Sequence, residues 1–147
     1  MNDGNAKSLK DLAKAMGDID FAMLTTRAED GRMTSRPMSN NGEVEYDGDS
    51  FYFTWDHSQM VKDIAAEANV GLTLQGRKGL LGAPPLFVAV EGLAEVIRDK
   101  AAFAAHWNSD MNRWFKQGAD TPGVVMIKVR AALVRYWDGD DEGELTP

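Results

Sequence analysis

The residues of this 147-residue chain that could do chemistry together are an arginine and two hydroxyl residues around a predicted helix start. Arg36 lies in a strand-like segment, Thr54 ends an apolar strand-like segment, and Ser58 precedes a helical pattern. A guanidinium, hydroxyl groups and the free N–H groups of a helix N-terminus all stabilise an anion, and together they suit a phosphate. Residues 34–62 therefore predict a binding site for the phosphate group of a small ligand.

Arg36 could be an exposed surface residue or a phosphate-binding residue, and its neighbours in the sequence help to decide between the two. An arginine in a strand is by itself more often an exposed surface residue. Pro37 has no N–H group, so the strand must be an edge strand or contain a bulge at this point. Such a strand leaves backbone groups free to meet a ligand, and an arginine can meet a phosphate with two parallel N–H donors. Thr34 and Ser35 add hydroxyls nearby. These features favour phosphate binding by Arg36.

The helix start at Ser58 offers a second set of donors. We expect the Ser58 hydroxyl and the N–H groups of Gln59 and Met60 to bind the same phosphate. Lys62 lies four residues after Ser58 on the same helix face, and helical side chains lean toward the N-terminus, so Lys62 could reach that anion. The alternative, in which Ser58 only caps the helix and Lys62 is a surface charge, stays open.

No catalytic residue can be assigned from the sequence. His57 lies beside the predicted phosphate site and could act as an acid or base, yet a loop histidine without a partner is more often just exposed. The chain contains no cysteine, and no Ser/His/Asp set or metal-ligand cluster emerges from its pattern. Trp114 lies in a polar segment, where it could cover a planar ligand or lie in a subunit contact.

Length and composition predict one globular domain over residues 1–147, with 44% apolar residues and a net charge of −7. This charge and the lack of a Lys/Arg stripe argue against nucleic acid as a partner. No apolar run approaches the roughly 20 residues of a membrane helix, and no secretory signal is seen, so we expect a cytoplasmic protein. Residues 138–147 are acidic and predict a solvated, flexible tail.

The pattern of apolar residues predicts mainly β structure in antiparallel pairs, with helices at the ends of a sheet or closed barrel. In the last strand, Val125, Ile127, Val129, Ala131 and Leu133 alternate with polar residues and should share one buried face. Helical patterns occur at residues 9–16, after Ser58, and at 99–107 and 110–115. Strands are expected at residues 19–26, 32–40, 50–54, 70–74, 86–97 and 123–137.

Several short segments follow one another in a characteristic order and spacing: Met23-Leu24-Thr25-Thr26, Ser35-Arg36-Pro37-Met38, Phe51-Tyr52-Phe53-Thr54, Ser58, residues 90–96, Trp107-Asn108 and Tyr136-Trp137-Asp138. Taken together, they resemble the flavin-binding split-barrel superfamily of pyridoxamine 5′-phosphate oxidase, and within it the general stress protein 26-like branch. The resemblance implies a six-stranded antiparallel Greek-key split β-barrel, a homodimer, and FMN bound between the two subunits, with FAD as an alternative flavin.

By position, the resemblance implies that Arg36 contacts the flavin phosphate or ribityl chain and that Phe53 and Thr54 flank this chain. Ser58 would hold the phosphate, and the second subunit would contribute residues from the region 107–116. The backbone along the flavin would be that of Pro37, Met38 and Ser39.

Three departures from the family pattern bear on function. Met60 stands where many relatives have a lysine, and Phe87 stands where the oxidases have a glutamine. The acidic end replaces the basic segment with which the oxidases bind pyridoxamine, so oxidation of vitamin B6 is not expected. The resemblance then implies an FMN-binding stress protein, as a flavin-dependent oxidoreductase of unknown substrate. A non-enzymatic flavin-storage or flavin-sensing module and a deazaflavin-dependent reductase are the alternatives.

Overall fold

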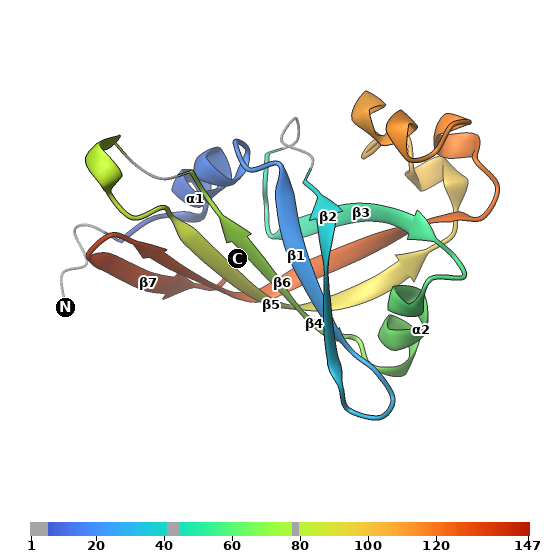
Figure 1. Cartoon of the computed structure of the whole chain (residues 1–147), viewed down its shortest axis with the longest axis horizontal. Helices are drawn as coiled ribbons and strands as arrows, with labels where there is room; N and C mark the ends of the chain where they lie inside the picture. The colour runs from blue at the N-terminus through green and yellow to red at the C-terminus, as the bar shows by residue number, and fades with distance from the viewer. Residues whose placement is uncertain (1–5, 41–44, 78–79) are drawn as a thin grey trace.

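An antiparallel sheet of seven strands dominates the computed structural model, which describes residues 6–40, 45–77 and 80–147 (Figure 1). Six strands follow one another in the order β2-β1-β4-β5-β6-β3, and β7 pairs with β6 outside this path. The strands are β1 (Phe21–Arg27), β2 (Met33–Ser39), β3 (Asp49–Trp55), β4 (Asn69–Gln75), β5 (Phe87–Ile97), β6 (Val124–Asp138) and β7 (Asp141–Leu145). The predicted fold class, an antiparallel split barrel with peripheral helices, is confirmed.

Two features of the sheet differ from the prediction. The sheet has seven strands instead of six, and its end strands β2 and β3 do not pair with each other among the described residues, so the barrel is not closed. The extra strand β7 lies in the segment expected to be a flexible acidic tail. Gly143 allows this pairing, because a Cβ atom there would lie 2.5 Å from the hydroxyl of Tyr136. The acidic composition of this segment had favoured a flexible tail. The segment is ordered because β7 pairs with β6 and Leu145 packs against the core.

A β-bulge in β6 changes which of its side chains face the core. The register shifts between Glu91 and Gly92 on β5, so that Ala132 on β6 has no partner there. This extra residue reverses the alternation, and Val134 and Tyr136 are buried in place of Leu133. The predicted burial of Leu133 is therefore wrong, whereas the four earlier residues of that pattern are buried as expected.

Two helices and four short 3₁₀ turns complete the described part of the chain. The helices α1 (Leu9–Met16) and α2 (Gln59–Ala66) are capped at their N-termini by Ser8 and Ser58, whose hydroxyls accept hydrogen bonds from backbone N–H groups. The segments expected to be helical near residues 99–115 form 3₁₀ turns. The four 3₁₀ turns of the described residues are Leu80–Gly82, Lys100–Ala102, Ser109–Arg113 and Gly118–Asp120, and the second and third of them lie in those segments. The sequence Asn40-Asn41-Gly42 is typical of a turn, and its last two residues lie outside the described residues. No helix in the described ranges is long and apolar enough to cross a membrane.

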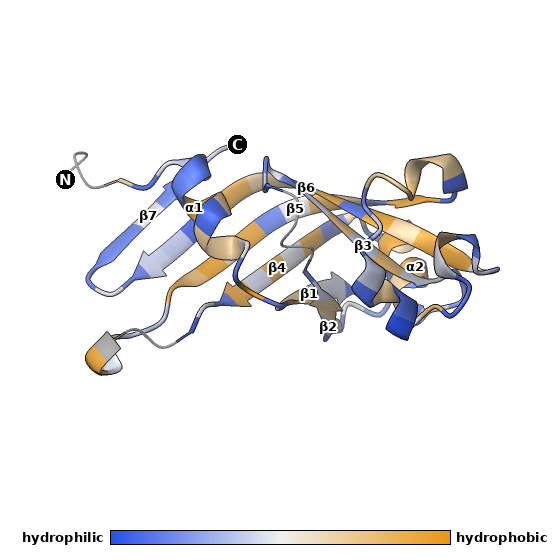
Figure 2. Ribbon diagram, turned by 90° about the horizontal axis from the view of Figure 1, so that it is seen from above, coloured by the Kyte–Doolittle hydropathy of each residue, from blue (hydrophilic) through white to orange (hydrophobic). Residues whose placement is uncertain are grey.

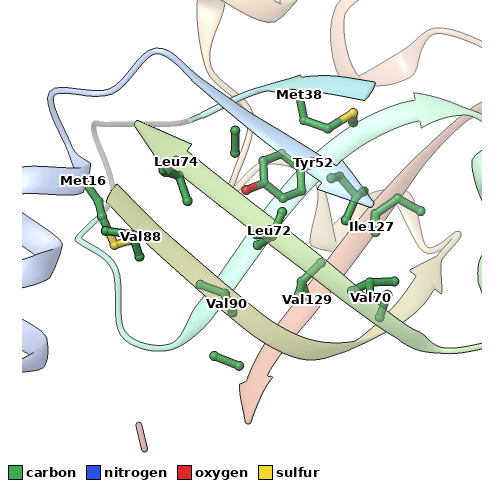
Figure 3. Close-up of a cluster of buried hydrophobic side chains, with 14 of the residues drawn as sticks. Met16, Met38, Tyr52, Val70, Leu72, Leu74, Val88, Val90, Ile127 and Val129 are labelled. Atoms are coloured by element: carbon green, nitrogen blue, oxygen red, sulfur yellow. The ribbon is translucent and has the colours of Figure 1, made fainter. Parts of the chain in front are cut away.

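Two apolar clusters hold these elements together. The larger cluster fills the barrel interior and includes Leu72, Val90 and Ile127, which point toward one another in Figure 3. The smaller cluster connects β3 and β6 to the segment 102–119, and it includes the fully buried Phe103. Both faces of the β3–β6 pair are therefore covered at this end. Figure 2 shows α2 and the 3₁₀ turns between residues 100 and 120 toward one end of the molecule, and α1 and the hydrophilic β7 toward the other. The smaller cluster positions one wall of the cavity described next.

Candidate functional site

A cavity of about 500 Å³ lies between the edge strand β2, the end of β3, the start of α2 and the 3₁₀ turn Ser109–Arg113. This volume falls within the range typical of cofactor sites. Every residue that the sequence predicted to contact a cofactor lines this cavity, with the single exception of Lys62. The lining residues are Phe21, Arg36, Pro37, Met38, Ser39, Phe53, Thr54, Trp55, Ser58, Gln59, Met60, Met111, Trp114 and Phe115.

Arg36 enters the cavity from β2, which is an edge strand, as the proline beside it predicted. Its Nη1 donates to the Leu24 carbonyl at 3.2 Å and to Thr26 Oγ1 at 2.8 Å. Its Nη2 lies 3.7 Å from Oδ2 of Asp63 on α2, a carboxylate whose side chain is only 1% exposed. Burial lowers the pKa of the Arg36 guanidinium, and the charge of Asp63 opposes this shift. The guanidinium is thus held in place from two elements.

Asp63 is fixed by further hydrogen bonds. Thr26 Oγ1 donates to Asp63 Oδ2 at 2.8 Å, and Nε2 of Gln59 donates to Asp63 Oδ1 at 3.0 Å. Gln59 lies one helical turn before Asp63 and also lines the cavity, so the network connects the helix start to Arg36. A buried carboxylate needs such partners, because an unpaired charge away from water is strongly destabilising.

The start of α2 presents polar groups to the same cavity. Ser58 Oγ accepts a hydrogen bond from the N–H of Val61 at 3.4 Å. The first N–H groups of a helix have no carbonyl partner within the helix, so they can bind a ligand. Thr54 lies at the end of β3, four residues earlier, and its side chain is half-buried at the cavity. The hydroxyls of Thr54 and Ser58, the helix N-terminus and the guanidinium of Arg36 therefore share one cavity. This donor set suits an anionic group.

The remaining walls are largely aromatic. Phe53 packs against Phe103 and Trp107 with ring centroids 5.5 and 4.6 Å away, and Trp55 packs against Phe115 at 4.9 Å. Trp114, with 57% of its surface exposed, stands at the rim of the cavity. Rings of this kind can stack on or cover a planar ligand.

Trp114 and its neighbours lie at the cavity of their own chain. The resemblance implies that the region 107–116 of a second subunit also reaches the site, and this stays a prediction. In the structure, Met111, Trp114 and Phe115 line the cavity of the same chain that supplies Arg36. The cause is the smaller apolar cluster, in which the buried Met111 and Phe115 attach this region to β3 and β6.

Thr34, Ser35, His57 and Lys62, four of the residues considered from the sequence, lie outside the cavity lining, and Thr34 is exposed on β2. Lys62 is exposed on α2, on the side that turns away from the buried Asp63 and Ile64. His57 is also exposed, with its ring 6.2 Å from that of Trp55. Ser35 is exposed, and its hydroxyl is 2.6 Å from that of Thr25. Among the residues that the structure describes, no group of three or more His, Asp or Glu could hold a metal ion.

Sequence reasoning missed Asp63 and Thr26. The sequence does contain a signal for Asp63, because this residue lies on the face of α2 whose other members, Met60, Val61 and Ile64, are apolar. A carboxylate on a buried helix face must find a partner, and Arg36 was the available cation. For Thr26, which is fully buried, the alternation of β1 predicted the inward direction but not the role.

Comparison with known proteins places this chain in a family. The family described as "Pyridoxamine 5'-phosphate oxidase like" matches residues 7–146. The chain belongs to this family. The general stress protein 26 of Bacillus anthracis is 26% identical in sequence, with 90% of this chain and 93% of that chain covered and a TM-score of 0.72. The predicted superfamily and its general stress protein 26-like branch are thereby confirmed.

Two further solved structures share the fold at lower identity. A Clostridium acetobutylicum protein related to general stress protein 26 is 16% identical, covers 94% of this chain and 93% of its own, and has a TM-score of 0.77. A protein named F420 reductase is 21% identical, with 82% of this chain and 92% of that chain covered and a TM-score of 0.60. No curated protein sequence matches the chain. These likenesses establish the fold and leave the ligand to be argued from the cavity.

Proposed function

We propose that this protein is a dimeric FMN-binding protein of the general stress protein 26-like branch that acts as a flavin-dependent oxidoreductase. The observation that carries the proposal is the convergence of Arg36, Thr54 and Ser58 in one cavity whose other walls are aromatic. FMN has the matching chemistry, a phosphate at one end and a planar ring at the other. In this arrangement the start of α2 and Arg36 hold the phosphate, while the backbone of residues 37–39 runs along the ribityl chain and ring.

The residues that line the cavity suit a flavin, but they do not identify the substrate of the reaction. When bound, the flavin would supply the electron transfer, and the protein would supply position and electrostatics. Trp114 at the rim would cover the ring and limit its contact with water. Oxidation of pyridoxamine phosphate is not part of the proposal. The C-terminal residues form the acidic strand β7, which Figure 1 shows at the end of the molecule away from α2.

The absorption spectrum and mass of the compound that copurifies with the protein test this function. FMN predicts the yellow spectrum of an oxidised flavin and the mass of a flavin monophosphate. If the compound instead has the mass of FAD or of a deazaflavin, that compound is the cofactor and the assignment of FMN is wrong. Bleaching of the bound flavin by NADH or NADPH supports the oxidoreductase. Tight flavin binding without any bleaching by these or other reductants would instead support the storage or sensing module.

We also propose a homodimer, because the outer face of the sheet carries exposed apolar side chains. Phe21, Met23, Phe87, Leu93 and Trp137 are each between 39 and 54% exposed. They lie on β1, β5 and β6, with Phe87 directly opposite Trp137 in the register. An apolar face of this kind marks an interaction surface.

Sedimentation should therefore show a dimer at micromolar concentration. Leu93→Asp places a charge on the proposed interface and should shift the protein toward a monomer, because an unpaired charge at a buried interface is costly. Leu81→Asp is the matched control, since Leu81 is fully exposed in a 3₁₀ turn away from the sheet. A wild-type monomer with flavin bound at this concentration would contradict the dimer.

Lys62→Ala should have almost no effect on flavin binding. Lys62 is exposed and outside the cavity lining, and substitutions of such surface residues usually change free energies by less than about 0.5 kcal/mol. The affinities of wild type and variant for FMN and riboflavin can be compared by titration, because only FMN carries the phosphate. A large loss of affinity for FMN alone would show that Lys62 reaches the phosphate. Lys62 would then take the role of the lysine that many relatives have at the position of Met60.

A further inference from the structure

The cavity holds one basic side chain among its lining residues, Arg36, and this side chain is paired with a buried carboxylate. Its Nη1 donates to Thr26 Oγ1, which in turn donates to Asp63 Oδ2, both at 2.8 Å. Its Nη2 lies 3.7 Å from the same carboxylate oxygen. The Thr26 hydroxyl therefore acts as acceptor and donor at once and links cation to anion. Arg36 supplies N–H donors to the cavity, but its positive charge is already compensated by the negative charge of Asp63.

The pairing is internal and shielded from water. The side chain of Asp63 is 1% exposed and that of Arg36 is 21% exposed, so solvent screens their attraction only weakly. A ligand phosphate that approaches Arg36 then meets the field of Asp63 as well. The other polar groups at the start of α2, the hydroxyls and N–H groups, carry no formal charge. An anion in this cavity is thus bound mainly by hydrogen bonds to a site of nearly zero formal charge.

We infer that Asp63 is a specificity-determining residue that lowers the attraction of the cavity for highly charged ligands by compensating Arg36. The inference rests on the proposed function, since it concerns the phosphate end of the flavin site. Removing the Asp63 charge would leave a buried cation without a counter-ion, which destabilises the free protein. A bound phosphate would then supply the missing negative charge. The variant should consequently prefer phosphate-bearing ligands more strongly than wild type does.

Asp63→Asn tests the inference, with Asp56→Asn as the matched control. Both variants raise the net charge by one, but Asp56 is half-exposed and pairs at the surface with Arg98 at 2.9 Å. We expect the ratio of FMN affinity to riboflavin affinity to rise about tenfold in Asp63→Asn, equivalent to ~1.4 kcal/mol. In Asp56→Asn the ratio should stay within about twofold, as for a screened surface charge. An unchanged or lower ratio in Asp63→Asn would overturn the inference; a lower ratio would show that Asp63 chiefly orients Arg36.

Inorganic phosphate separates this inference from the flavin proposal. Added phosphate should raise the Tm of Asp63→Asn more than the Tm of wild type or Asp56→Asn, whether or not a flavin binds. If wild type binds neither flavin but phosphate stabilises Asp63→Asn selectively, the proposed function fails and the inference stands. If flavins bind and neither the ratio nor the phosphate effect changes, the inference alone fails.

A measurement on wild type covers the case in which Asp63→Asn does not fold. A compensated Arg36 predicts that the affinity for FMN falls by less than about twofold between low and high salt, because little formal charge remains to be screened. A steep loss of FMN affinity with salt, with riboflavin affinity unchanged, would show an uncompensated cation and contradict the inference.

Discussion

Arg36→Ala should weaken FMN binding by about 1.5–3 kcal/mol, the loss expected for a hydrogen bond to a charged group. Arg36 is the cavity residue that combines a charge with several N–H donors, and β1 and α2 hold it in place. Riboflavin affinity should change much less, because riboflavin lacks the phosphate. Titration of both flavins, followed by fluorescence, gives the two free energies directly.

The control for this variant must separate the ligand contact from the buried network. Arg36→Ala leaves Asp63 without its cation, so circular dichroism and thermal unfolding must first show a folded protein. Arg36→Lys retains a positive charge near Asp63 but loses the paired N–H donors, and its FMN affinity should lie between those of wild type and Arg36→Ala. Unchanged FMN affinity in a folded Arg36→Ala protein would remove Arg36 from the proposed site.

Phe103→Ala should reduce the free energy of unfolding by about 3–5 kcal/mol, as expected when a fully buried phenylalanine is truncated. Phe103 is 0% exposed and packs at 5.5 Å against the ring of Phe53, which lines the cavity. The same cluster contains Met111 and Phe115, two further cavity residues. Flavin affinity should therefore fall together with stability. Denaturant unfolding measures the first effect and flavin titration the second.

Met33→Ala is the control for this prediction, since Met33 is 63% exposed on β2 and away from the smaller cluster. Its free energy of unfolding should change by less than about 0.5 kcal/mol. If Phe103→Ala lost stability but bound flavin as wild type does, the smaller cluster would stabilise the fold without shaping the cavity.

The sequence predicted most of the sheet, because its strands carry a period-two pattern and end in clear turn residues. Asp30-Gly31, a pair of residues typical of hairpins, connects β1 and β2, and Gly31 has φ 87°. Ser58 was predicted as an N-cap from residue type alone and is one. Two errors have local physical causes. The bulge at Ala132 reversed the face of the last part of β6, and the acidic residues of β7 concealed a strand held by Gly143 and Leu145.

The site was predicted less completely than the fold, and the missing part is tertiary. Local patterns identified Arg36, Thr54 and Ser58, which the structure brings to one cavity. They did not show that Thr26 on the neighbouring strand β1 and Asp63 on α2 would both engage Arg36. Periodicity reports which side chains are buried, but it does not report which buried groups meet each other.

A crystal structure of the protein with FMN is the most direct test of the proposed site. The account predicts one flavin per chain in the cavity, with its phosphate within hydrogen-bond distance of Ser58 and Arg36 and its ring against the aromatic wall near Trp114. A flavin bound elsewhere, or an empty cavity at a saturating FMN concentration, would contradict the account.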